Sequence, residues 1–334
     1  MRSLLASLLF AGAAIGFSAP PTFAVTHKFA LSGEGGWDCL TVDGVAHRLY
    51  ISRGTRVQIM DTENGNLVGE ITDTPGVHAI AINHKRNEGY ISSGRDNSVK
   101  IFDLKTMKTT ESVPVGQNPD VIMFDAHSNQ VFSFNGRSND ATILDASTHK
   151  VVGTVAIGGK PEFAASDEKG SIFVNVEDTS EIKQIDVHKR AVVKVWSIKP
   201  GEEPSGLAFD MKGHRLISVC SNQTMVVSDS AKGSVVSFVP VGKGPDGAAW
   251  DPAWKLAFSP NGQDGTLTIV SLEGKEPKVV QTLETMRSAR TIAYDPARHA
   301  AYLIAAEFDA PAPGQRRGKM KPGSAVILVV EPKR

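Results

Sequence analysis

The chain has 334 residues, 41% of them hydrophobic and 22% charged, and its 36 basic and 36 acidic residues give a net charge of zero. This length and apolar content exclude an intrinsically disordered chain. The charge balance argues against a nucleic-acid binder, because such proteins carry a basic excess or a basic stripe. We therefore do not expect nucleic acid as a partner.

Residues 1–24 have the pattern of a secretory signal peptide. Arg2 gives the positive start, Leu4 to Phe17 form an apolar core, and Thr22-Phe23-Ala24 is the cleavage site. The apolar core is too short for a membrane span, although an uncleaved anchor is the alternative. We predict cleavage after Ala24 and a mature domain of residues 25–334 that is periplasmic or secreted and has no membrane span.

The mature chain repeats a unit of about forty residues seven times. The clearest copies close with a Val-Gly or Ile-Gly pair at Gly116, Gly158 and Gly242. An Asp or Asn before a turn marks all seven copies, at Asp43, Asn83, Asp125, Asp167, Asp210, Asp251 and Asp295. A fixed period of this length indicates one supersecondary unit per copy, with a core that forms only when neighbouring units pack together.

The third copy shows what the unit is. Four short apolar runs lie at residues 121–124, 131–134, 142–144 and 151–157, and Asn, Gly, Asp and Ser separate them. Runs this short, rich in Val, Ile, Phe and Thr, are typical of strands. No long amphipathic stretch supports a helical repeat. Four antiparallel strands per repeat predict the blade of a β-propeller.

The last copy supplies only three strands, at residues 291–294, 301–305 and 325–330. The missing fourth strand is predicted at the other end of the chain, in His27 to Ser32. The sequence therefore predicts an all-β, seven-bladed propeller whose ring the N-terminal strand closes within the last blade. Closure removes exposed sheet edges, so we expect a monomer.

The repeats match a known pattern at several places. Matching pieces are Tyr50-Ile51-Ser52, Tyr90-Ile91-Ser92, Ile101-Phe102-Asp103, and Val113-Pro114-Val115-Gly116 with Pro119. On these residues the chain resembles the YVTN-type, YncE-like β-propeller family of surface-layer and periplasmic proteins, a WD-like repeat. The resemblance implies the fold rather than an activity, because the motif residues build the blade.

One mouth of the central channel is predicted to carry a polar ring. In a propeller the first strand of each blade lines the channel, and the residues at its start are Asp38, His78, Asp120, Glu162, Ser205, Asp246 and Arg290. The loops between second and third strands add further candidates: Arg53, Arg95, Asn135 and Asn175. Polar groups that converge on a concave mouth predict a ligand-binding site. The alternative is that the Asp and Ser residues only bond nearby turn amides.

Four of these side chains are candidate metal ligands: Asp38, Asp120, Glu162 and Asp246. Clustered carboxylates raise one another's pKa or take up a cation. Oxygen ligands suit Ca²⁺ or Mg²⁺ better than Zn²⁺.

Three classes of function remain open. No nucleophile motif or phosphate-binding loop appears, so no catalytic residue is assigned and we favour a non-enzymatic role. The first class is a periplasmic binding or interaction module for an unknown small molecule or periplasmic protein. The second is a metal-dependent hydrolase or lactonase, as in other propeller enzymes. The third, which the resemblance implies for some relatives, is a single-stranded nucleic-acid binder.

Two further features carry expectations. The Pro/Gly-rich insert at residues 309–323 contains the basic run Arg316 to Lys321, which we expect to be a solvated loop, with a recognition arm as the alternative. Cys39 and Cys220 fall on blades across the ring from each other, too far apart for a disulfide. We therefore predict two free thiols.

Overall fold

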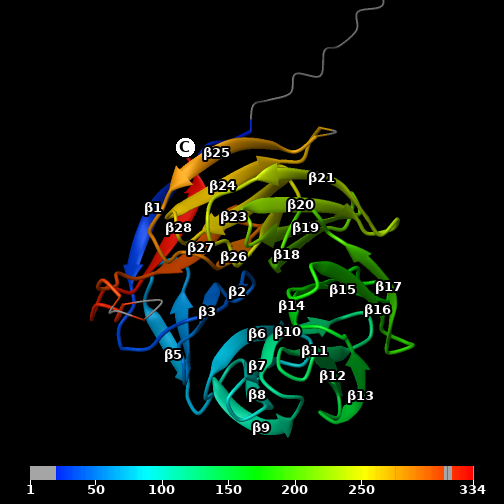
Figure 1. Ribbon diagram of the computed structural model, residues 1–334. Helices are drawn as coiled ribbons and strands as arrows, with labels where there is room; N and C mark the ends of the chain where they lie inside the picture. The colour runs from blue at the N-terminus through cyan, green and yellow to red at the C-terminus, as the bar shows by residue number, and fades with distance from the viewer. Residues whose placement is uncertain (1–19, 275, 312–313, 315–317, 334) are drawn as a thin grey trace, which may run out of the picture.

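The computed structural model describes residues 20–274, 276–311, 314 and 318–333. Within them, 28 strands form seven four-stranded antiparallel sheets, arranged as blades around a central axis (Figure 1). The predicted all-β, seven-bladed propeller is confirmed. No helix of the described residues is long and apolar enough to cross a membrane.

Each blade starts at the channel and proceeds outwards in chain order. Blade 1 contains β2 (Leu40–Asp43), β3 (Arg48–Ser52), β4 (Val57–Asp61) and β5 (Leu67–Ile71). Blade 2 contains β6 (Val77–Asn83), β7 (Glu88–Ser93), β8 (Ser98–Asp103) and β9 (Lys108–Pro114). Blade 3 contains β10 (Pro119–Asp125), β11 (Gln130–Asn135), β12 (Asp140–Asp145) and β13 (Val151–Ala156).

The next three blades follow the same order. Blade 4 contains β14 (Pro161–Ser166), β15 (Ser171–Val176), β16 (Glu181–Asp186) and β17 (Ala191–Ser197). Blade 5 contains β18 (Pro204–Asp210), β19 (Arg215–Cys220), β20 (Thr224–Asp229) and β21 (Ser234–Pro240). Blade 6 contains β22 (Ala249–Asp251), β23 (Leu256–Asn261), β24 (Thr266–Ser271) and β25 (Lys278–Glu284).

Blade 7 joins the two ends of the chain. It contains β26 (Ile292–Asp295), β27 (Ala300–Ala305), β28 (Val326–Pro332) and, as its outer strand, β1 (Phe23–Ala30). Figure 1 shows the blue β1 beside the red β28, with which it pairs antiparallel. The N-terminal strand closes the ring as predicted.

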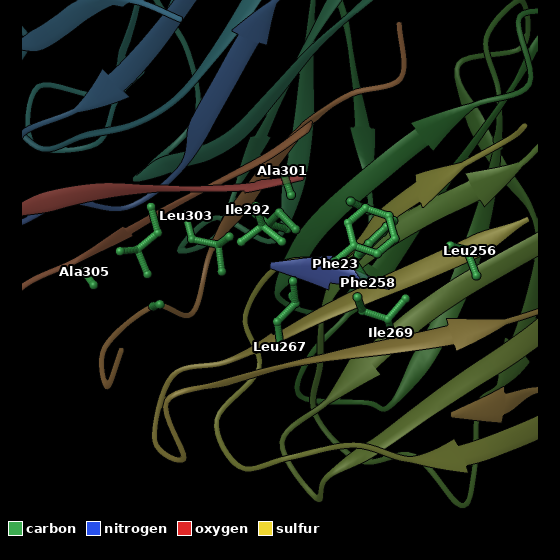
Figure 2. Close-up of a cluster of buried hydrophobic side chains, with 13 residues drawn as sticks. Phe23, Leu256, Phe258, Leu267, Ile269, Ile292, Ala301, Leu303 and Ala305 are labelled. Atoms are coloured by element: carbon green, nitrogen blue, oxygen red, sulfur yellow. The ribbon is translucent and has the colours of Figure 1, made fainter. Parts of the chain in front are cut away.

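The bounds of this closing strand correct the prediction of His27 to Ser32. The strand begins at Phe23 and ends at Ala30, because an apolar contact anchors its start. Phe23 is fully buried between blades 6 and 7, and Figure 2 shows it beside Phe258. Phe23 and Ala24 thus belong to the propeller, although the sequence places them inside the signal peptide. Residues 1–19 of that predicted segment lie outside the described residues.

Aspartates close the hairpins between third and fourth strands. The five residues are Asp61, Asp103, Asp145, Asp186 and Asp229. Each carboxylate accepts the backbone amides two and three residues later, at 2.7–3.1 Å. The residue four positions after each aspartate has a positive φ, between 53° and 76°, as in a turn that ends in a left-handed residue. The repeated aspartates are therefore turn-formers.

Every outer strand carries an irregularity that protects the blade edge. In all seven blades the pairing between the outer strand and its neighbour shifts register once. A bulge of this kind twists an edge strand and disfavours pairing with another chain.

The two cysteines confirm the prediction of free thiols. Cys39 and Cys220 are both buried and unpaired. Burial raises the pKa of Cys220 to about 12. The Cys39 thiol lies near the channel mouth, and burial together with the negative charges of Asp38 and Asp120 raises its pKa well above the ordinary value.

Candidate site at the channel mouth

The start of each innermost strand positions the candidate side chains. His78, Asp120 and Glu162 are the second residues of β6, β10 and β14, and these strands lie around the centre of the ring in Figure 1. Asp38, Asp246 and Arg290 precede β2, β22 and β26. A proline lies directly before Asp120, Glu162 and Asp246; proline fixes φ and is accommodated at the first position of a strand.

The polar groups form a chain of ion pairs that crosses from blade to blade. His78 Nδ1 lies 2.6 Å from Asp38 Oδ2 and 3.6 Å from Asp120 Oδ1. Arg290 lies between two carboxylates, with Nη2 at 3.3 Å from Asp38 Oδ1 and Nε at 3.2 Å from Asp246 Oδ2. Side chains of blades 6, 7, 1, 2 and 3 are thereby linked in order. The mouth ring is defined here as these five residues together with Lys160, Glu162 and Glu177.

Lys160 is a member of the mouth ring that sequence reasoning missed. Its Nζ lies 2.8 Å from Glu162 Oε1 and also contacts Glu177. Burial alone would lower the pKa of Lys160, but the hydrogen bonds from its ammonium to these two carboxylates raise it. Lys160 directly precedes Pro161, the first residue of β14. The repeat spacing that located Glu162 could therefore have identified Lys160 as well.

The pKa values of three mouth-ring carboxylates are raised, whereas that of the turn aspartate Asp103 is lowered. Burial raises the pKa of Asp120 to about 6. Burial, with the charge of Asp120, raises the pKa of Glu162 to about 8, against the effect of Lys160. Burial also raises the pKa of Asp246, although Arg290 opposes it. At Asp103, by contrast, turn amides lower the pKa.

His78 is oriented by its two aspartates. Burial by itself lowers the pKa of His78, but the hydrogen bond to Asp38 and the charge of Asp120 raise it above the ordinary value. The imidazolium form is thereby favoured, with the Nδ1 proton donated to Asp38.

The structure also brings together a candidate metal-ligand set that differs from the four predicted carboxylates. One ligand atom each from Asp38, His78 and Asp120 lies within 4.8 Å of the others. Glu162 and Asp246 instead make ion pairs with Lys160 and Arg290. A mixed nitrogen and oxygen set is less selective for Ca²⁺ and Mg²⁺ than the predicted all-oxygen set.

Three predicted site residues are fully buried: Arg53, Asn135 and Asn175. Arg53 donates to the Gly33 carbonyl, Asn135 bonds Asp140 and Thr142, and Asn175 donates to Ser205 and Gly206 carbonyls. Their positions at or just after the ends of second strands turn these side chains into the packed interior, where they satisfy local groups. Arg95 is exposed.

A cleft of about 930 Å³ extends from the mouth over blades 5, 6 and 7. At its inner end it reaches Glu177, Asp246 and Arg290, and at its outer end it reaches Glu307 and Phe308 of the insert that joins β27 to β28. The base of this insert is ordered, because Phe308 pairs with Met320 and packs on Trp37 with ring centroids 6.0 Å apart. The described residues of the insert itself are exposed apart from the half-buried Gly318 and Met320, so its described part is largely solvated beyond this base. Arg316 and Arg317 lie outside the described residues.

The turns between first and second strands lie on the face of the ring opposite the mouth, and two of their histidines have structural partners. His84 Nε2 lies 2.8 Å from Asp43 Oδ1 on the neighbouring blade. His299 lies 2.6 Å from Asp251 Oδ2 and stacks on Trp254 with ring centroids 3.7 Å apart. These contacts join blades and engage the turn aspartates that mark the repeat.

Sequence comparisons give short matches. The family described as "Anaphase-promoting complex subunit 4 WD40 domain" matches residues 178–261. The proteins called "Uncharacterized protein YncE" of Salmonella typhimurium and Salmonella typhi are each 30% identical over 89 residues. Each match covers 26% of this chain and 25% of the relative, so the aligned part spans about a quarter of the relatives' length.

Solved structures share the ring over a much larger part of the chain. "Crystal Structure of Mitotic Checkpoint Complex" has a TM-score of 0.77 at 12% identity and covers 100% of this chain and 99% of that one. "Structure of U3-55K" has a TM-score of 0.77 at 9% identity, covering 94% and 100%. "Kuenenia stuttgartiensis Hydrazine Synthase" has a TM-score of 0.71 at 16% identity, covering 82% and 94%. Identities this low show the fold alone. Together, the YncE matches, the WD40-type match and the seven-bladed ring support a YncE-like β-propeller family.

Proposed function

We propose that this protein is an exported, periplasmic or secreted binding module whose mouth ring receives a cationic group of its ligand. The observation that carries the proposal is the charge of the ring. Five carboxylates, of Asp38, Asp120, Glu162, Glu177 and Asp246, meet two permanent cations, Lys160 and Arg290, and one histidine.

The carboxylate excess makes the mouth a trap for positive charge. With His78 protonated, the ring carries two negative charges more than positive ones when every carboxylate is ionised, and one more when Glu162, whose pKa is raised to about 8, is protonated. Low-dielectric walls concentrate such a field and attract cationic ligands. An incoming ammonium or guanidinium would also relieve the repulsion that, with burial, raises the pKa of Glu162. The same charges would repel a nucleic-acid phosphate, which disfavours the third class of function.

A divalent cation is the second candidate for the same place. The grouping of Asp38, His78 and Asp120 favours it, and such an ion would serve a metal-dependent hydrolase by activating water or a carbonyl. The Cys39 thiol near the mouth does not favour cysteine chemistry, because its raised pKa keeps it protonated.

Calorimetric titration with spermidine tests the first candidate. We expect binding that weakens with salt and that Asp246→Asn weakens roughly tenfold, the value of one charge-assisted hydrogen bond. Glu168→Gln, an exposed carboxylate of the opposite face, is the matched control and should bind like the parent. Equal affinity of the parent and Asp246→Asn would refute the proposal.

The metal version has its own test. Ca²⁺, Mg²⁺ or Mn²⁺ at saturating concentration should raise the melting temperature of the parent by mass action, and His78→Ala should abolish the shift. No shift with any of the three ions would exclude a metal role for the mouth.

A further inference from the structure

The cleft beside the mouth is much larger than one cationic group needs. Its volume of about 930 Å³ lies in the range of about 300–1,000 Å³ typical of small-molecule sites. A metal ion or an ammonium at the mouth ring would fill only its inner end. The rest of the cleft has room for further parts of a ligand.

The cleft carries charges of both signs. The carboxylates of Glu177, Glu203 and Asp246 line it from blades 4, 5 and 6. Arg287, an exposed residue in the loop from β25 to β26, lines the side toward blade 7, and the insert on that side adds Asp309 and the ion pair of Glu307 with Lys321. No described carboxylate makes an ion pair with Arg287, and no described cation makes one with Glu203. Each side thus has a charge that is not neutralised by the described residues.

The surface between these charges is apolar or hydrogen-bonding. Pro245 and Met286 line it, and Phe308 and Pro311 of the insert form a further apolar wall. Ser205 lies at the inner end. Carboxylates toward blades 4 to 6, an apolar wall and the cation of Arg287 suit a ligand with an amino group, an apolar body and an acid group.

The insert is positioned closely enough to act as a wall. The Asp309 amide donates to the Lys319 carbonyl at 2.9 Å, and the Lys321 amide donates to the Glu307 carbonyl at 2.8 Å. Gly318 approaches so closely that a Cβ there would lie 1.8 Å from the Asp309 carbonyl oxygen. Only glycine is accommodated at this position without moving the wall.

We propose that the cleft binds a short peptide with free termini. Its ammonium lies toward Asp246 and Glu203, an apolar side chain lies against Phe308 and Met286, and its carboxylate lies toward Arg287. The inference rests on the proposed function for the ammonium end and extends it to the class of ligand.

The probe is the tripeptide Ala-Phe-Ala, titrated calorimetrically as the free zwitterion, as its N-acetyl form and as its C-terminal amide. Loss of a charged hydrogen-bond partner weakens binding roughly ten- to a hundredfold, so we expect both blocked peptides to bind less tightly. In Arg287→Ala the free peptide and the amide should bind equally. In Asp246→Asn the preference for the free amino group should fall.

Two further variants distinguish binding in the cleft from binding at the mouth ring and from a general loss of structure. Gly318→Ala should weaken the tripeptide while spermidine binding remains, because only the insert moves. Lys85→Ala, an exposed cation of the opposite face, should leave both ligands unaffected. If the tripeptide does not bind while spermidine binds in an Asp246-dependent way, the peptide inference is wrong and the proposed function stands. Equal binding of free and blocked tripeptides would also overturn the inference.

Discussion

The start of the closing strand makes a strong and measurable prediction. Phe23 is fully buried and makes edge-to-face contacts with Phe258 at 5.3 Å and Trp254 at 6.0 Å. The Gln281 amide clamps its backbone, accepting from the Phe23 N–H and donating to its carbonyl, both at 2.8 Å. Removing a buried phenylalanine side chain costs about 3–5 kcal/mol. A chain that begins at Val25 should therefore lose a large share of the roughly 5–15 kcal/mol that stabilises a typical domain.

Urea unfolding followed by tryptophan fluorescence measures this loss, since Trp254 contacts Phe23. Three proteins are compared: a chain that begins at Thr22, a chain that begins at Val25, and Phe23→Ala in the longer chain. The last two should unfold at a lower urea midpoint with an unchanged slope. If the chain from Val25 unfolds at the midpoint of the longer chain, Phe23 does not anchor the ring. The comparison also decides whether the predicted cleavage after Ala24 is compatible with a stable propeller.

Three other predictions concern the mouth, the thiols and the turns. The pKa of Asp120 is raised to about 6 and that of Glu162 to about 8. Because the folded protein holds these protons more tightly than the unfolded chain, the stability gained is fully present below the ordinary carboxyl pKa of about 4. It is lost as the pH rises through about 6 and about 8. The urea midpoint of the parent should therefore decrease as the pH is raised from about 5 to 8. The double variant Asp120→Asn/Glu162→Gln should show a smaller decrease. An equal decrease in parent and variant would contradict the burial of these groups. Intact mass after alkylation under denaturing, non-reducing conditions should show two labelled thiols, Cys39 and Cys220, and an unlabelled pair would indicate a disulfide. Asp145→Ala removes three turn hydrogen bonds, from the Ser147 and Thr148 amides and from the Thr148 hydroxyl. It should lower the free energy of unfolding by about 1–2 kcal/mol, whereas an unchanged urea midpoint would show that these bonds are dispensable.

The sequence by itself determined the ring. Aspartates at a fixed spacing form the turns that close hairpins. Short apolar runs form strands, whose apolar faces are buried only against a neighbouring blade. These are local rules, so the number of blades, the closing strand and the face that carries Asp38, His78 and Asp120 all followed from the register. The register also placed Cys39 and Cys220 too far apart to pair.

Only the tertiary structure decided how side chains are used. Arg53, Asn135 and Asn175 occupy the predicted positions along the chain, but blade packing turns them into the interior. The mouth carboxylates bond to partners on neighbouring blades, and the insert meets Trp37 from the far end of the sequence. The sequence pattern assigns Phe23 to a signal peptide, whereas in the structure its side chain packs between blades 6 and 7. Such contacts depend on distances between segments remote in sequence, which a repeat pattern does not contain.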